Sequence, residues 1–111
     1  MELNVVVANE LKYVPISIQL LSINPSNKQE KLIFQSKNLV NIYSGGYLGK
    51  EFQTTKVQIN PNEQLYAYVP EFELFEQIDL EPDSVFLDVS VWDDEYPYIL
   101  TTYDTIRSRI D

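Results

Sequence analysis

The chain contains no cysteine and no histidine in its 111 residues. Without cysteine it can form no disulfide, no thiolate nucleophile and no cysteine-ligated zinc or iron–sulfur centre. Without histidine it lacks the side chain that most often serves as a general base and as a transition-metal ligand. Ser-His-Asp and Cys-His catalysis are therefore excluded. The absence of cysteine is also typical of proteins in reducing compartments.

Glycine is scarce, and long apolar runs are missing. The three glycines, Gly45, Gly46 and Gly49, fall in one segment that lacks the Lys-Ser/Thr pair of a phosphate-binding loop. We expect a hairpin loop there. No apolar run has the length that spans a bilayer, and the first residues lack the basic and apolar regions of a signal peptide. We therefore expect a cytoplasmic protein with no cofactor.

Negative charge is concentrated in the second half of the chain. Residues 1–62 hold six lysines against four acidic residues, a net of +2, and residues 63–111 hold thirteen acidic residues against two arginines, a net of −11. No cation lies between Lys56 and Arg107. Such a surface repels nucleic-acid phosphates and anionic membranes. We expect a basic protein partner, with no direct binding of nucleic acid or membrane; the alternative is an acidic surface that serves only solubility.

What the sequence has in quantity is the pattern of short β-strands. Apolar and β-branched residues alternate or cluster over residues 3–7, 16–23, 31–36, 38–43, 52–59, 64–69, 71–75, 85–92 and 98–103. Turn residues separate these runs, as in Asn24-Pro25-Ser26-Asn27. The phase shift at Leu21 indicates a β-bulge or a strand that is buried on both faces.

Two segments keep alternatives open. A helical turn that starts at Pro70 would bring Phe72, Phe75 and Ile78 close to one face, although we favour a strand over residues 71–75. Residues 104–111 fit either a short helix or a frayed tail. The sequence predicts one all-β domain over residues 1–111. We expect a β-sandwich, immunoglobulin-like or a related Greek key, of about seven or eight short antiparallel strands with room for one short helix.

One turn resembles a known family. The segment Leu80-Glu81-Pro82-Asp83-Ser84-Val85-Phe86 is similar to the turn that enters the penultimate strand of immunoglobulin-like domains, where a Leu-x-Pro-Asp-Ser stretch precedes a tyrosine. Phe86 takes the place of that tyrosine and has no hydroxyl to bond back to the turn. The resemblance covers this turn alone, and what it implies concerns the fold and not the function.

Aromatic rings alternate with aliphatic residues in the later strands. In residues 64–69, Tyr66 and Tyr68 alternate with aliphatic positions, and Trp92 does so at the end of residues 85–92. If the aliphatic faces form the core, the rings lie outside, beside the acidic residues, where tyrosine and tryptophan act as interface hot spots. The alternative is that both faces are covered. The candidate partner-binding residues are Tyr66, Tyr68, Asp88, Trp92, Asp93, Asp94, Glu95, Tyr96 and Tyr98.

The acidic loop Asp93-Asp94-Glu95 invites two further interpretations. It is similar to the aspartate-rich loops of calcium-dependent lipid-binding sandwiches, but those sites draw on two loops, and residues 1–62 hold no second acidic loop. Glycoside hydrolysis needs a carboxylate pair, such as Asp88 with Asp93 or Asp94. A chain of this length leaves little room for a deep cleft beside a core. We therefore expect no enzyme and assign no metal ligand.

Three hypotheses of function follow. The first is a non-catalytic protein–protein interaction module whose acidic, aromatic surface binds a basic partner. Its sharper form is an inhibitor or immunity protein that occupies a nucleic-acid-binding groove, with carboxylates in place of phosphates and tyrosines in place of bases. The second is a structural subunit that assembles through strand edges into a homo-oligomer. The third is a calcium- or sugar-binding β-sandwich module.

Overall fold

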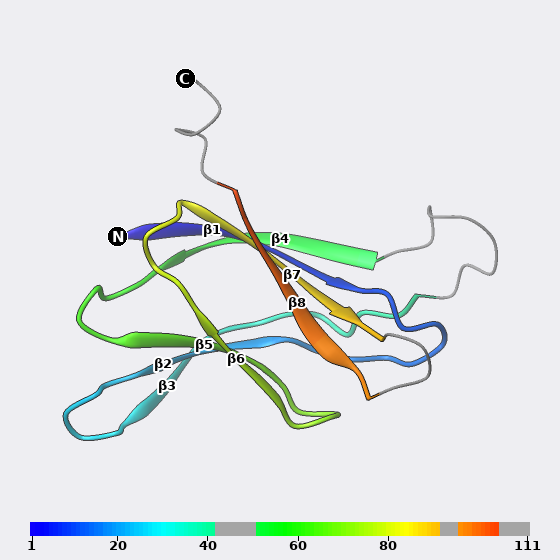
Figure 1. Cartoon of the computed structure of the whole chain (residues 1–111), viewed down its shortest axis with the longest axis horizontal. Coiled ribbons are helices and arrows are strands. Elements are labelled where there is room, and N and C mark those ends of the chain that lie inside the picture. Colours follow the sequence, from blue (N-terminus) through cyan, green and yellow to red (C-terminus); the bar gives the residue numbers. More distant parts are fainter. Residues whose placement is uncertain (42–50, 92–95, 105–111) are drawn as a thin grey trace.

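The architecture is an all-β sandwich, and the computed structural model describes it for residues 1–41, 51–91 and 96–104. The two four-stranded sheets have the strand orders β4-β1-β7-β8 and β3-β2-β5-β6, and they stack face to face (Figure 1). The part described contains no helix long and apolar enough to cross a membrane. The expected fold class is confirmed. The strands are β1 (Glu2–Asn9), β2 (Gln19–Ile23), β3 (Glu30–Gln35), β4 (Glu51–Gln58), β5 (Gln64–Val69), β6 (Leu74–Ile78), β7 (Ser84–Ser90) and β8 (Tyr98–Asp104).

One strand pair departs from the expected antiparallel arrangement. β1 runs parallel to β7, with Val5 opposite Val85 and Val7 opposite Leu87. The other neighbours in both sheets are antiparallel. A hairpin turn forces its two strands to be antiparallel, but β1 and β7 are far apart in the sequence and no turn sets their relative direction. The prediction of antiparallel strands throughout is therefore wrong for this pair.

Pro70 moves the start of β6 away from the predicted position. The amide of Phe72 donates to the carbonyl oxygen of Val69 (3.3 Å), which closes a β-turn with Pro70 at its second position, where the fixed φ of proline fits. Glu73 then has a φ of 53°, and β6 begins only after it. The strand predicted over residues 71–75 is thus wrong for its first three residues.

Three other local predictions have different outcomes. The register between β2 and β3 shifts between Leu20 and Leu21, which confirms the predicted irregularity. The strand predicted over residues 38–43 is wrong for the residues described, because Leu39 forms only an isolated bridge with Ile16. The helix or tail predicted for residues 104–111 lies almost entirely outside the described residues. The turn before Ser84 does enter the penultimate strand, β7.

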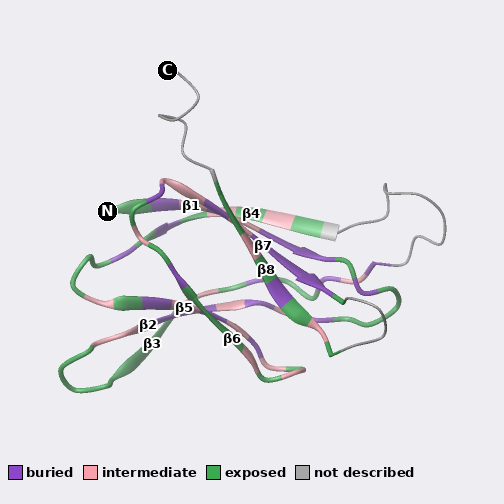
Figure 2. Ribbon diagram, viewed as in Figure 1, coloured by how far each residue is buried: buried purple, intermediate pink, exposed green. Residues whose placement is uncertain are grey.

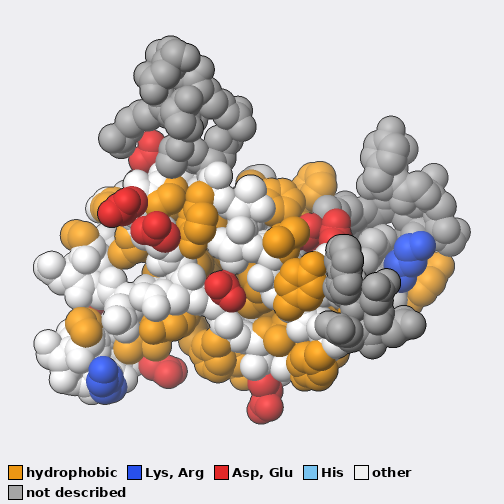
Figure 3. All heavy atoms as spheres, in the orientation of Figure 1, with side chains coloured by type: hydrophobic (Ala, Val, Ile, Leu, Met, Phe, Trp, Pro, Cys, Tyr) orange, Lys and Arg blue, Asp and Glu red, His pale blue; other side chains and the backbone are white. Residues whose placement is uncertain are grey.

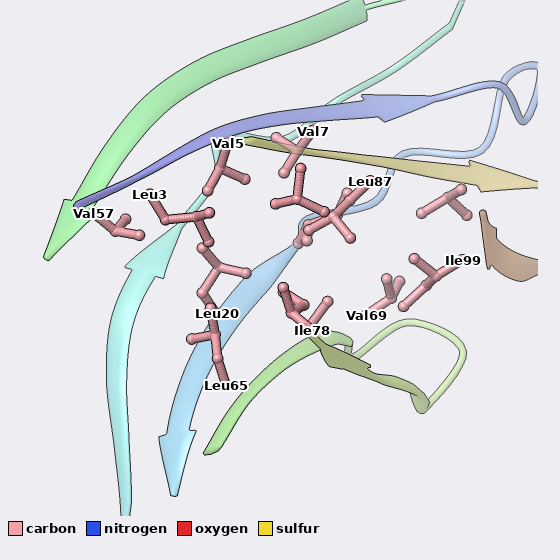
Figure 4. Close-up of a cluster of buried hydrophobic side chains, with 14 of the residues drawn as sticks. Leu3, Val5, Val7, Leu20, Val57, Leu65, Val69, Ile78, Leu87 and Ile99 are labelled. Carbon is pink, nitrogen blue, oxygen red and sulfur yellow. The ribbon is translucent and has the colours of Figure 1, made fainter. Parts of the chain in front are cut away.

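The aliphatic faces of the strands meet between the two sheets. Leu65, Ala67 and Val69 of β5 are buried, and so are Val85, Leu87 and Val89 of β7, which confirms the predicted inward direction for these residues. Val91, predicted on the same face, lies beyond the end of β7 and is 45% exposed, so its prediction is wrong. Figure 2 shows buried positions recurring along the facing strands. In Figure 4 the side chains from both sheets converge in one layer, including Leu3, Val5, Val7, Leu20, Ile78 and Ile99.

A buried asparagine holds the irregular segment that follows β1. The Nδ2 of Asn9 donates to the carbonyl oxygens of Val14 (2.8 Å) and Leu39 (2.9 Å), and its Oδ1 accepts from the amide of Leu11 (2.8 Å). This segment has only isolated bridges to residues 39 and 41. Because buried backbone groups need partners, the side chain of Asn9 supplies the bonds that a regular ladder would otherwise provide.

Replacing Asn9 with alanine should lower the free energy of unfolding by about 2–4 kcal/mol, because three buried backbone groups lose their partner. Urea unfolding measures the change. Asn60→Ala is the matched control, since Asn60 Oδ1 accepts a similar bond from the Asn62 amide (2.9 Å) on the exposed surface, and its loss should cost about 1 kcal/mol or less. Equal losses for the two variants would contradict the role given to Asn9.

Candidate partner-binding surface

The structure divides the predicted site residues between opposite faces of the sandwich. Tyr66 and Tyr68 lie on β5, on the outer face of the sheet β3-β2-β5-β6. Asp88 and Tyr98 belong to β7 and β8 of the other sheet. Strands of different sheets that turn the same pattern toward a common core must turn their other faces in opposite directions. The expectation that rings and carboxylates share one outer surface is therefore wrong for these four residues.

Asp88 is not an exposed carboxylate. Its side chain is 4% exposed, and it lies in a central strand between Ala8 of β1 and Leu100 of β8. Ala8 is also fully buried, although its place between the inward-facing Val7 and Asn9 turns it toward the outer face. This part of the outer face is covered, and Asp88 is too deep to touch a partner. Its prediction as a partner-binding residue is corrected accordingly.

The residues Trp92, Asp93, Asp94 and Glu95 lie outside the described residues. The hot spot predicted at Trp92 and the calcium-binding loop considered at residues 93–95 therefore remain predictions. Within the ranges that the structure describes, no group of three or more histidine, cysteine, aspartate or glutamate side chains is placed to hold a metal ion.

Tyr96, just before β8, contacts the β5–β6 hairpin of the other sheet. Its ring packs edge-on against Phe72, with ring centroids 5.9 Å apart and planes at 86°. Its hydroxyl donates to the carbonyl oxygen of Phe72 (2.9 Å), in the turn between β5 and β6. The ring is nevertheless 66% exposed. Tyr96 therefore both supports this turn and contributes exposed surface beside it. Tyr98, in contrast, lies on β8, on the outer face of the sheet β4-β1-β7-β8.

The residues that the structure does bring together form a ring face on the outer side of β3-β2-β5-β6. Tyr68 of β5 lies directly opposite Phe75 of β6, and the two rings stack with centroids 4.3 Å apart and planes at 26°. Phe75 is 57% exposed. Tyr66 lies opposite Leu21, which in turn lies opposite Leu32. We call this set the ring face: Leu21, Leu32, Tyr66, Tyr68 and Phe75.

Phe75 and Leu32 were missed as candidate residues. The sequence signal for Phe75 was its place in an alternating segment, but its contact with Tyr68 follows only from the register of the β5–β6 hairpin. For Leu32 the sequence predicts a strand but not the direction in which its side chain points. Its outward direction follows from its place opposite Leu21, across the irregular β2–β3 pairing, which the local pattern does not reveal.

Exposed carboxylates border the ring face at the β5–β6 hairpin. Glu71 and Glu73 lie in the turn. Glu76 lies on the edge strand β6 opposite the inward-facing Ala67, and so on the other side of β6 from Phe75. All three are exposed. The carboxylate of Glu71 accepts from the amide (3.2 Å) and the hydroxyl (3.4 Å) of Ser17, so it also ties the turn to the segment before β2. In Figure 3, which shows the side where β6 and β8 lie in front, acidic side chains interrupt a broad hydrophobic surface. We call Glu71, Glu73 and Glu76 the acidic rim.

The other sheet has a hollow of about 440 Å³ on its outer face, lined by residues that include Asn4, Val6, Phe86 and Thr102. Phe86 is half-buried there. This hollow brings together Phe86, Tyr103 and small polar side chains, and none of its lining residues is acidic. The ring face combines a stacked ring pair with carboxylates in the neighbouring turn. The ring face is therefore the more distinctive recognition surface.

Comparisons with known proteins identify no relative: no protein-family model, no curated protein and no solved structure matches the chain. A function for the protein therefore has to come from the geometry and charge of its own residues.

Replacing Tyr96 with phenylalanine should lower the free energy of unfolding by about 0.5–1.5 kcal/mol, because the bond from its hydroxyl to the Phe72 carbonyl oxygen is lost. Thermal or urea unfolding measures the change. The matched control is Tyr13→Phe, since the ring of Tyr13 is similarly exposed, at 62%, and a change at such a position should stay within about 0.5 kcal/mol. No difference between the two variants would show that Tyr96 does not support the turn.

Proposed function

We propose that the protein is a non-catalytic docking module that binds a basic protein partner through the ring face and the acidic rim. One observation carries the proposal: the stacked pair of Tyr68 and Phe75 lies on a solvent-facing sheet surface, beside carboxylates. No lysine or arginine occurs in the chain between Lys56 and Arg107. The β5–β6 hairpin that forms this surface therefore brings no cation of its own to neutralise the rim.

The two kinds of side chain recognise the same partner chemistry. Guanidinium and ammonium groups bind carboxylates, and they also lie favourably over the faces of aromatic rings. Aromatic residues at the centre of a surface with charged residues around them match the usual composition of protein interfaces. The carboxylates would speed association with a basic surface, while Phe75 and Tyr68 would supply the buried contact area.

A sharper form of the proposal concerns the normal ligand of that partner. A surface of carboxylates and exposed rings offers a groove that binds nucleic acid the same two interactions as its ligand, negative charges and flat π faces. The module would then act as an inhibitor by occupying that groove. What supports this form is the combination of the exposed Glu71 and Glu73 of the turn with the ring pair on one hairpin.

An immobilised arginine-rich peptide serves as the probe for the proposed function. Phe75→Ala should weaken binding by about tenfold, as the loss of an interface hot spot does. Phe52→Ala is the matched control, because Phe52 is also 57% exposed but lies on β4 of the other sheet, and it should change binding less than about twofold. Surface plasmon resonance measures both affinities, and urea unfolding checks that both variants remain folded.

Binding should also weaken steeply as salt rises, because exposed charge pairs are screened. Equal losses for Phe75→Ala and Phe52→Ala, or an affinity that does not depend on salt, would contradict the proposed surface. The inhibitor form is tested by the same assay with a nucleic-acid-binding protein as the immobilised probe. If the module occupies the nucleic-acid-binding groove, single-stranded DNA should displace the wild-type module from that probe. If the probe binds the module and the DNA at the same time, the proposal of a docking module remains and the inhibitor form is contradicted.

A further inference from the structure

The two edges of the sheet β3-β2-β5-β6 carry opposite charge. β3 and β6 are its outer strands, and in the part of the chain that is described no strand pairs with either of them on its outer side. Exposed lysines flank β3 at Lys28, Lys31 and Lys37, with Glu30 between them. The charged residues in and next to β6 are all acidic, and all are exposed: Glu71, Glu73, Glu76, Asp79 and Glu81.

The two edges also run in opposite directions. β3 is antiparallel to β2, β2 to β5, and β5 to β6. A second copy moved sideways along the sheet would therefore bring its β3 antiparallel to β6, and the alternation of strand direction would continue without a break. The inner face of each sheet would remain inside, because the second copy has the same orientation as the first.

The other sheet does not have this property. β4 is antiparallel to β1, β1 is parallel to β7, and β7 is antiparallel to β8. Its outer strands β4 and β8 therefore run in the same direction, and the same sideways addition would create a parallel pair. Parallel pairing is slightly less stable per residue than antiparallel pairing, so the sheet with the charged edges is the better one for addition.

Apolar residues lie at both of the charged edges. Leu32 of β3 is 51% exposed, and Phe75 of β6 is more than half exposed. Both belong to the ring face, so an added β3 would carry its Leu32 on the same face of the joined sheet as Phe75. The unpaired backbone groups of an edge strand are a template for a further strand, and the apolar residues would be buried in part when that strand adds.

We propose that the β3 edge of a second copy binds the acidic β6 edge, so that copies of this chain join head to tail. This inference rests on the proposed function, because the lysines at the β3 edge of a second copy would be the basic surface that the same acidic, aromatic hairpin binds, although the chain as a whole is acidic. Two β3 edges would bring lysines together and two β6 edges would bring carboxylates together, and like charges across a strand pair are unfavourable. Only the β3–β6 contact joins opposite charges, and such a contact produces a ring or an open filament.

The experiment uses two variants of opposite sign. The β3-edge variant is Lys28→Glu/Lys31→Glu. The β6-edge variant is Glu73→Lys/Glu76→Lys/Glu81→Lys, because three of the five acidic residues at β6 must be replaced before that edge becomes positive. Sedimentation velocity at physiological salt measures the weight-average mass of each as concentration rises. The wild-type mass should increase with concentration, and each variant alone should stay at the mass of a monomer, because its two edges then carry the same sign.

An equimolar mixture of the two variants should associate again, because each edge of one is then complementary to the opposite edge of the other. The matched control is Lys12→Glu/Lys56→Glu, which changes the net charge as much as the β3-edge variant does but lies away from both edges, and it should associate like the wild type. Circular dichroism confirms that every variant keeps its β structure, so that a loss of association is not a loss of folding.

Two results would overturn the inference. A wild-type chain that remains monomeric at all concentrations would exclude the second copy as partner. Association that the mixture fails to restore, or that the control also loses, would assign the contact to another surface. The proposed function is tested separately: if only the β6-edge variant loses the arginine-rich peptide, the docking surface stands even where self-association fails.

Discussion

The two sheets share a single layer of aliphatic side chains, and in strands such as β5 the outward direction of the remaining side chains follows from filling that layer. Successive side chains of a strand point to opposite faces. Burying Leu65, Ala67 and Val69 against the other sheet therefore obliges Tyr66 and Tyr68 to lie outside. A shift of β5 by one residue would bring two phenolic hydroxyls into a layer without partners for them. The ring face is thus a direct consequence of the core.

The aliphatic layer closes at its ends through a few buried polar side chains. Asn9 holds the segment after β1, as its three short bonds show. Ser36 does the same after β3: its Oγ accepts from the amide of Ile18 (2.9 Å) and donates to the carbonyl oxygen of Lys37 (2.8 Å). In both places the chain leaves the regular ladder while it is still buried, and a side chain completes the bonding of the backbone.

The two sheets differ in what they offer a partner. The sheet β3-β2-β5-β6 combines exposed rings with acidic residues at one edge and lysines at the other. The sheet β4-β1-β7-β8 contains the parallel pair and buries its one central carboxylate, Asp88. The proposals for a basic partner and for a second copy both concern the sheet β3-β2-β5-β6.

Part of this fold could be predicted because the relevant pattern is local. Alternation over residues 64–69 and 85–92 predicted which side chains turn inward, and the charge count predicted that the later strands carry the acids. The phase shift at Leu21 predicted the irregular register with β3. Pro70 shows the limit of such patterns, because a turn and a strand compete for the same residues, and the bonds of the finished hairpin decide between them.

The sequence by itself determined the β class, the inward faces of the later strands and the absence of histidine and thiol chemistry. Only the tertiary structure decided that Tyr66 and Asp88 lie on opposite faces, that Asp88 is buried, and that Phe75 stacks on Tyr68. The physical reason is that alternation states which face of a strand is apolar, whereas strand pairing depends on contacts between residues far apart in the chain. The sheet to which a strand belongs, and so the direction of its outer face, is settled by those distant contacts.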